Sequence, residues 1–126
     1  MEFPANLKYT KDHEWVRVEG TTGVIGITDY AQGELGDVVF VEFPVVGAKV
    51  EFGHTFGTVE AVKAVSDLYS PVTGIVSAVN KEIQDSPETV NKDPYDRGWM
   101  IKVTLENLAE LNNLLDVDAY KKLIGQ

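Results

Sequence analysis

Short apolar runs separated by glycine and proline dominate the chain between residues 23 and 105. Runs of this kind at regular spacing are typical of the strands of a β-sandwich or β-barrel. An earlier apolar run, residues 15–19, is followed by Gly20 and Gly23. Both glycines can take the positive φ that a tight hairpin requires. The strands that this pattern predicts cover residues 15–19, 24–27, 38–41, 74–79 and 99–103.

Two segments between the expected strands have a different pattern. Residues 28–35 predict one or two helical turns, with Thr28 or Asp29 as N-cap and Gly36 closing the helix. Residues 85–95 are rich in turn-forming residues, which predicts a surface loop with one helical turn at its first proline. Both segments are expected to connect strands.

After Leu105 the apolar period changes to that of a helix. Four leucines then fall on one helical face, behind two polar residues with the spacing of a capping box. A second short helix is expected to begin at an aspartate N-cap and to end at a glycine. These helices predict a cover over the sheet. The residues are Asn107, Glu110 and leucines 108, 111, 114 and 115, then Asp116 and Gly125 with Val117, Tyr120 and Ile124 facing inward.

Composition narrows the class of protein. Eleven basic and twenty acidic residues among 126 give a net charge of −9, and 44% of the chain is hydrophobic. This size and composition predict one globular domain, and no apolar run approaches the roughly 20 residues of a membrane span. The acidic balance disfavours nucleic acid and favours protein partners with basic faces.

The chain has few of the residues that form metal or thiol sites. The chain has no cysteine, which excludes disulfides, thiolate metal sites and cysteine nucleophiles. His13 and His54 cannot by themselves build a usual zinc site, so no metal is expected. The first residues resemble neither a signal peptide nor a transit sequence, which predicts a cytoplasmic protein or a processed organellar one.

The stretch 56–71 carries the most informative lysine of the chain. Strand alternation before it places Phe56, Thr58, Glu60 and Val62 on one face. Small residues then carry the chain round a bend, and a second strand returns antiparallel. The pattern therefore predicts Lys63 near the tip of a hairpin.

Lys63 is unsuited to be the nucleophile of its own enzyme. Glu60 and Asp67 lie close in sequence and favour its charged, unreactive form. An exposed, unreactive amine on a rigid tip is suited to modification by a separate enzyme. This reading competes with that of an ordinary solvated loop lysine.

The surroundings of Lys63 resemble the lipoylation site of the glycine cleavage system H-protein family. Residues 59–67, Ser70-Pro71 and Gly74 carry this likeness. Further blocks similar to the family follow one another along nearly the whole chain: 13–16, 26–32, 35–41, Pro44 with Gly47, 90–91, 93–95 and 98–100.

Related carriers differ at the same positions. Biotinyl domains resemble this fold but typically have methionines on both sides of their lysine, where this chain has Val62 and Ala64. Acyltransferase lipoyl domains usually have aspartate in the position of Val62. One departure from the H-protein pattern is Ala61, where serine is common.

The resemblance implies a mainly β lipoyl/biotinyl-type barrel-sandwich hybrid with short helices and a C-terminal helical cover. Residues 1–126 would form a single lipoyl-carrier domain, with a β core at about 7–105 and a helical segment at about 107–125. It also implies lipoate attached to Lys63 as N6-lipoyllysine. Gly47, Glu60 and Gly74 match the framework by which lipoate-attaching enzymes recognise such domains.

The implied function is that of a non-catalytic carrier of the glycine cleavage system. Lipoyl-Lys63 would take an aminomethyl group from the pyridoxal-phosphate glycine decarboxylase (P protein) to the tetrahydrofolate-dependent aminomethyltransferase (T protein). Dihydrolipoyl dehydrogenase (L protein) would reoxidise the arm. Residues that match the family's arm cleft are Asp12, Glu14 and Asp67.

The resemblance leaves two alternatives open. A related protein could donate lipoyl groups to other complexes, or serve as an unlipoylated binding module. The family also implies a monomer that works in the bacterial cytoplasm, or in the mitochondrial matrix if the chain is a processed organellar one.

Overall fold

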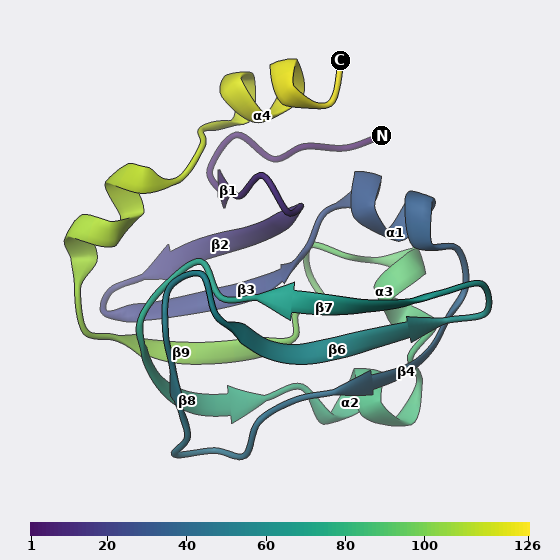
Figure 1. Cartoon of the computed structure of the whole chain (residues 1–126), viewed down its shortest axis with the longest axis horizontal. Helices are drawn as coiled ribbons and strands as arrows, with labels where there is room; N and C mark the ends of the chain where they lie inside the picture. The colour runs from purple at the N-terminus through teal and green to yellow at the C-terminus, as the bar shows by residue number, and fades with distance from the viewer.

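A computed structural model describes residues 1–126 as two antiparallel sheets with short helices around them (Figure 1). The larger sheet has six strands in the order β1-β2-β3-β9-β8-β5, and the smaller has three in the order β4-β6-β7. The strands are β1 Lys8–Tyr9, β2 Glu14–Glu19, β3 Thr22–Ile27, β4 Val38–Glu42, β5 Lys49–Val50, β6 Thr55–Ala61, β7 Val65–Tyr69, β8 Gly74–Val79 and β9 Ile101–Leu105. The mainly β prediction is confirmed.

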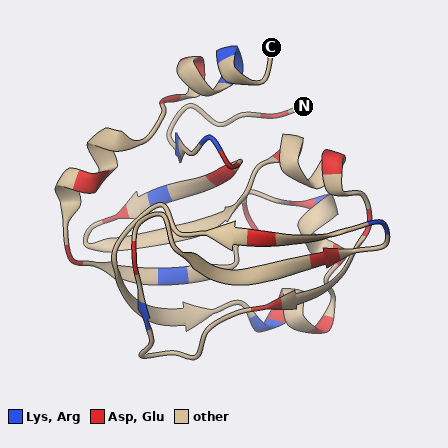
Figure 2. Ribbon diagram, in the orientation of Figure 1, with Lys and Arg blue, Asp and Glu red and all other residues tan.

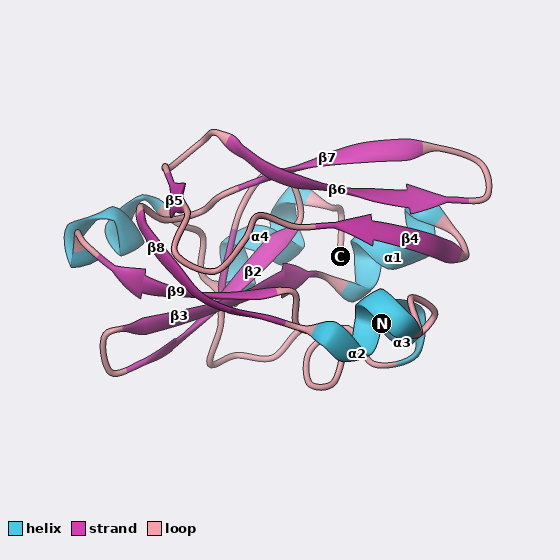
Figure 3. Cartoon of the chain, turned by 90° about the horizontal axis from the view of Figure 1, so that it is seen from below, coloured by secondary structure: helices cyan, strands magenta, loops and turns pink.

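The helices gather in two places. Figure 3 shows α1, α2 and α3 at the end of the molecule where the β6–β7 hairpin turns, whereas α4 lies beside the N-terminal strand. Their bounds are α1 Asp29–Leu35, α2 Lys81–Asp85, α3 Thr89–Lys92, the 3₁₀ helix η1 Leu108–Asn113 and α4 Val117–Leu123. None of them is both long and apolar enough to cross a membrane.

The main core contains side chains from both sheets. Val59 and Leu68 of the small sheet belong to the same buried cluster as Ile25 and Ile101 of the large one. A smaller cluster on the other side of β2 holds Trp15 with residues of β1 and α4. Because β3 contributes to both clusters, five of its six residues are buried.

Gly26 allows the second cluster to pack. A Cβ atom at this position would lie 2.6 Å from the Trp15 ring, so only glycine fits. The Trp15 indole N–H donates to the carbonyls of Ile27, at 2.9 Å, and Pro94, at 3.1 Å. Trp15 is therefore a core residue whose polar atom is satisfied.

Most of the expected elements are present. Thr28 caps α1 by accepting a hydrogen bond from the Ala31 N–H, and Gly36 ends the helix with φ +80°. Asp116 caps α4 in the same way, through the Ala119 N–H. The predicted final strand begins two residues later than expected, at Ile101.

The helix predicted after Leu105 is wrong in type. Residues 108–113 form a 3₁₀ helix, and Leu108 is 53% exposed rather than part of an apolar stripe. Glu110 does not complete a capping box, because its carboxylate accepts bonds from the Thr73 N–H and hydroxyl at 2.8 and 2.7 Å. Glu110 therefore bonds Thr73, which is distant in sequence, instead of the N-terminus of its own helix.

The segment 80–95 is more ordered and more buried than a surface loop. It contains the unpredicted helix α2, capped by Asn80, and the helix α3, which begins after the expected proline. Ile83 and Val90 are fully buried in the main core. Helices of five and four residues are too short for a helical period to be recognised among the turn-forming residues beside them.

Two details of the predicted hairpins are also wrong. Gly20 has the expected positive φ of 65°, but Gly23 lies inside β3. In β6 a register shift between Thr55 and Gly57 breaks the alternation, so Phe56 is buried while Glu60 is exposed. A bulge of this kind adds a residue to one strand and reverses the faces beyond it.

Candidate functional site

Lys63 lies in the turn between β6 and β7, as predicted. The Ala61 N–H donates to the Ala64 carbonyl at 2.8 Å and closes the turn. The Val62 N–H donates to the Asp37 carbonyl at 3.0 Å, which ties the hairpin tip to the segment between α1 and β4. Lys63 is thus exposed on a backbone that is held from two sides.

The lysine side chain lies over the backbone of Gly36. A Cβ atom at Gly36 would be 3.4 Å from the Lys63 Cε. Because Gly36 has a positive φ, glycine satisfies both the backbone conformation and the close approach. The stem of Lys63 therefore rests beside the C-terminal end of α1.

Asn91 of α3 holds the segment beneath the lysine, and the sequence analysis gave it no role. Its Nδ2 donates to the Gly36 carbonyl at 2.8 Å, and its Oδ1 accepts from the Val38 N–H at 2.9 Å. These bonds flank Asp37, the residue that holds Val62. The available signal was the family-like block at residues 90–91.

A cavity of about 170 Å³ lies between the small sheet and the elements β2, β3 and α1. It brings together all three residues of the predicted arm cleft. The lining residues are Asp12, His13, Glu14, Ile27, Ala31, Glu34, Leu35, Val59, Ser66, Asp67 and Leu68. Apolar core side chains form its floor, and carboxylates stand around it.

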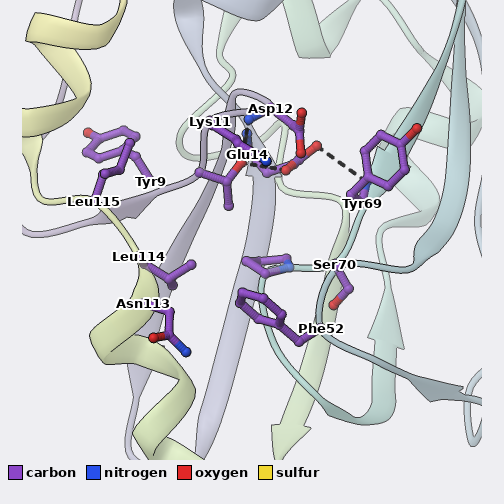
Figure 4. Close-up of a pocket in the computed structure, with 13 residues that line it drawn as sticks. Tyr9, Lys11, Asp12, Glu14, Phe52, Tyr69, Ser70, Asn113, Leu114 and Leu115 are labelled. Carbon is purple, nitrogen blue, oxygen red and sulfur yellow. Dashed lines mark hydrogen bonds between the residues drawn. The ribbon is translucent and has the colours of Figure 1, made fainter.

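Glu14 is the buried carboxylate of this cavity, with 2% of its surface exposed. The Thr10 hydroxyl donates to its Oε1 at 2.6 Å, and the Tyr69 N–H donates to its Oε2 at 3.3 Å (Figure 4). Burial raises the Glu14 pKa to about 7, although these two bonds act in the opposite direction. Glu14 therefore exchanges its proton near neutral pH.

Asp67 lines the cavity through its main chain. Its neighbours Ser66 and Leu68 are partly or fully buried, so alternation turns the Asp67 side chain to the outer, exposed face of β7. Its carbonyl and N–H point to the same strand edge as the Tyr69 N–H that bonds Glu14. The cavity thus receives a backbone carbonyl at this position.

His13 forms another wall of the cavity in an unusual backbone conformation. Its φ of 71° is the one positive value at a residue other than glycine. The ring Nδ1 lies 2.9 Å from the Tyr120 hydroxyl, which also lies 2.8 Å from the Thr28 hydroxyl. Burial lowers the His13 pKa, which favours the neutral ring at pH 7. Helix α4 therefore helps to fix a wall of the cavity.

A larger cavity, of about 620 Å³, adjoins the first and shares Asp12 and Glu14 with it (Figure 4). Phe52, Gly53 and Ser70 line it from the far end of the hairpin. A strand of the length of β6 places this end roughly 20 Å from the tip. The smaller cavity is the closer to Lys63.

One of the three predicted recognition residues lies apart from the other two. Glu60 is three residues from Lys63 on the exposed face of β6. Gly74 begins β8, and Gly47, in the β4–β5 loop, donates its N–H to the Val76 carbonyl of β8 at 2.8 Å. Figures 1 and 3 show the start of β8 at the opposite end from the hairpin tip. Gly74 permits close packing, because a Cβ there would lie 2.1 Å from the Thr104 carbonyl oxygen.

Comparisons with known proteins agree on one family. The family model described as Glycine cleavage H-protein matches residues 7–126. The chain belongs to this family. A glycine cleavage system H protein from Staphylococcus haemolyticus is 56% identical over 126 residues, all of both chains. One from Carboxydothermus hydrogenoformans is 55% identical over 123 residues, covering 98% of this chain and 95% of the relative.

A solved structure shows the same fold. The crystal structure of a glycine cleavage system H protein from Mycobacterium marinum superposes with a TM-score of 0.91 at 38% identity. The match covers 98% of this chain and 100% of the other. Family and fold together confirm the recognition made from the sequence, and with it a carrier protein of the glycine cleavage system rather than an enzyme.

Proposed function

We propose that Lys63 is the lipoyl attachment residue through which this member of the family carries the aminomethyl group of glycine. The observation that supports this most is an exposed lysine on a pinned hairpin tip beside an acid-lined cavity. The stem of Lys63 and a lipoyl chain together span roughly 14 Å when extended. Asp67 lies four residues along the chain, at most about 13 Å away, so the cavity is within reach.

Attachment forms an amide at the Lys63 Nζ. The deprotonated amine attacks the carbonyl carbon of an activated lipoyl group, the mixed anhydride with AMP (an acyl adenylate). The new C–N bond replaces the C–O bond to the leaving group, AMP departs, and the nitrogen loses a proton. Lys63 supplies only the nucleophilic atom, while a lipoate-attaching enzyme supplies the activated acyl group and the base.

The bound lipoyl group supplies a disulfide that accepts the aminomethyl group and electrons, and is later reoxidised. The partners proposed for this cycle are the P, T and L proteins of the glycine cleavage system. This chain's own contribution is to position Lys63, to shelter the arm and to present a surface for docking. The −9 charge supports docking to basic faces.

The cavity is suited to hold a protonated amine. Asp12 and the Glu14 carboxylate offer charge-assisted hydrogen bonds, and the Asp67 carbonyl adds a neutral acceptor. A cation beside Glu14 favours its ionised form, so an ammonium group in the cavity would lower the Glu14 pKa from its raised value of about 7. Apolar walls from Ile27 and Val59 exclude water from the held group.

We propose that the lipoate-attaching enzyme contacts Glu60 directly. Gly47 and Gly74 would act through the backbone, because they shape the opposite end of the molecule. The carrier is proposed to be a monomer whose residues 1–126 form one domain, with a β core at about 7–105. A bacterial cytoplasmic location is proposed because the relatives are bacterial, with the mitochondrial matrix as the alternative for a processed organellar chain.

Reconstitution tests this function against a lipoyl-donor role. Lipoylated chain is combined with purified P, T and L proteins, pyridoxal phosphate, tetrahydrofolate, NAD and labelled glycine. Carbon dioxide release that depends on the chain supports the shuttle. A lipoylated chain that gives no release, while a relative's H protein does, would overturn it.

A further inference from the structure

The outer face of the small sheet belongs neither to the core nor to the cavity. Phe40 pairs with Glu60, and Glu60 pairs with Val65, so the three side chains form one row across β4, β6 and β7. Phe40 is 51% exposed and Val65 64% exposed. Two large apolar side chains therefore flank an exposed carboxylate close to Lys63.

A bulge in β4 creates part of this exposure. The register shifts between Val38 and Phe40, and Val39 and Phe40 are both exposed although they are consecutive. Bulges next to functional sites commonly redirect a side chain. Exposed apolar patches on soluble proteins mark interaction surfaces when they are contiguous.

The charge on this face indicates the chemistry of its partner. The next row of the sheet joins Glu42, Thr58 and Asp67. Strands β4, β6 and β7 contain no lysine or arginine, so their exposed charges are all carboxylates (Figure 2). A complementary surface presents a basic side chain between apolar contacts.

An enzyme that forms a bond at the Lys63 Nζ also covers this row of side chains, because the row is so close to the lysine. An extended lysine side chain reaches only about 6 Å from its Cα. A standard interface of about 800 Å² per partner covers a circle of roughly 16 Å radius. Glu60 lies three strand residues from Lys63, or about 10 Å, which is inside that circle.

We propose that Phe40, Glu60 and Val65 form the docking surface for the lipoate-attaching enzyme, which places a basic side chain on Glu60 and apolar groups on its two neighbours. This inference rests on the proposed attachment at Lys63. The attaching enzyme is the occupant because it must bring its reacting atoms to Nζ itself. Enzymes that act on a mounted arm work roughly 14 Å from the lysine Cα and need the sheet less.

The test measures lipoylation of the unmodified full chain by a purified lipoate ligase with ATP and lipoate. Phe40→Thr and Val65→Thr remove the apolar contacts at exposed strand positions. Val18→Thr is the matched control, because Val18 is 40% exposed on β2 of the other sheet. Thermal unfolding and circular dichroism verify that all variants fold.

Phe40→Thr is expected to raise KM for the chain about tenfold with kcat unchanged, the behaviour of an interface hot spot, and Val65→Thr about threefold. Val18→Thr stays at the wild-type value. In the wild type KM rises with salt, and Glu60→Gln removes most of that rise. Folded Phe40 and Val65 variants with wild-type KM would overturn the proposal. A wild-type chain that is never modified would instead contradict the attachment site itself.

Discussion

Strand β3 of the large sheet and strand β7 of the small sheet are buried to very different extents. In β3 of the large sheet five of six residues are buried, whereas in β7 of the small sheet one of five is. Strand β3 has residues in buried clusters on both of its faces, whereas β7 has one face toward the core and one outward. The difference separates a scaffold that provides stability from a surface that presents Lys63.

This division explains how one short chain can be both rigid and accessible. The hairpin with Lys63 has a free strand edge along β7, and that edge supplies the bond to Glu14 rather than another strand pair. The hairpin tip is held by one backbone bond to Asp37 and one within the turn instead of by apolar burial. Lys63 and the bond to Glu14 thus lie at the tip and at the free edge of the small sheet.

The largest expected effect comes from the scaffold. Ile25→Ala removes a fully buried side chain of β3 and should lower the free energy of unfolding by about 4 kcal/mol. Urea unfolding measures the loss, with Val18→Ala on β2 as an exposed control. A loss below about 1 kcal/mol would show that β3 is less tightly packed than its burial indicates.

Glu14 should make stability depend on pH at the junction of the two sheets. Its folded pKa of about 7 exceeds the ordinary 4.5, so its contribution is fully present below pH 4.5 and is lost as the pH rises through 7. The loss is about 3 kcal/mol. Unfolding at pH 4.5 and pH 8 should show this fall in wild type and not in Glu14→Gln.

The glutamine variant has a small cost of its own. Its side chain has one acceptor oxygen and cannot accept from both Thr10 and Tyr69 as Glu14 does. The informative quantity is therefore the difference between the two pH values rather than either stability alone. Parallel profiles for wild type and Glu14→Gln would contradict the raised pKa.

Asn91→Ala should loosen the lysine tip more than the scaffold. It removes the bonds to Gly36 and Val38, at a cost of about 1 to 2 kcal/mol. Hydrogen exchange of the Val62 amide should accelerate, because its acceptor Asp37 loses both supports, while the Ile25 amide changes only with global stability. Equal acceleration at both amides would indicate a purely global role.

The outer face of the small sheet should tolerate change most easily. Val65→Thr keeps a β-branched shape at an exposed position, so stability should change by less than about 0.5 kcal/mol. Thermal unfolding measures the change beside Ile25→Ala. A loss above about 1 kcal/mol would indicate that this face is part of the packed structure.

The sequence predicts the parts of the fold that depend on local pattern. Apolar runs bounded by glycine and proline located most of the strands, and the Thr28 and Asp116 caps set the starts of α1 and α4 because side chain and partner lie within three residues. The Lys63 hairpin was predictable for the same reason. Its family likeness supplied the three acidic residues that the cavity brings together.

Distant partners decide the parts that sequence reasoning missed. Glu110 bonds Thr73 rather than its own helix, and the Asn91 clamp joins residues more than fifty positions apart. Bulges in β4 and β6 reverse the faces of Phe40 and Phe56, which strict alternation cannot foresee. The role of Asp67 also depends on which strand edge is free.

The most direct test of the account is the intact mass of the chain produced with lipoate and an active lipoate ligase, beside a Lys63→Arg variant. Peptide fragmentation locates any added mass. The account predicts a single lipoyl increment on Lys63 that is absent from the variant. An unmodified wild-type chain, or an increment on another lysine, would contradict it.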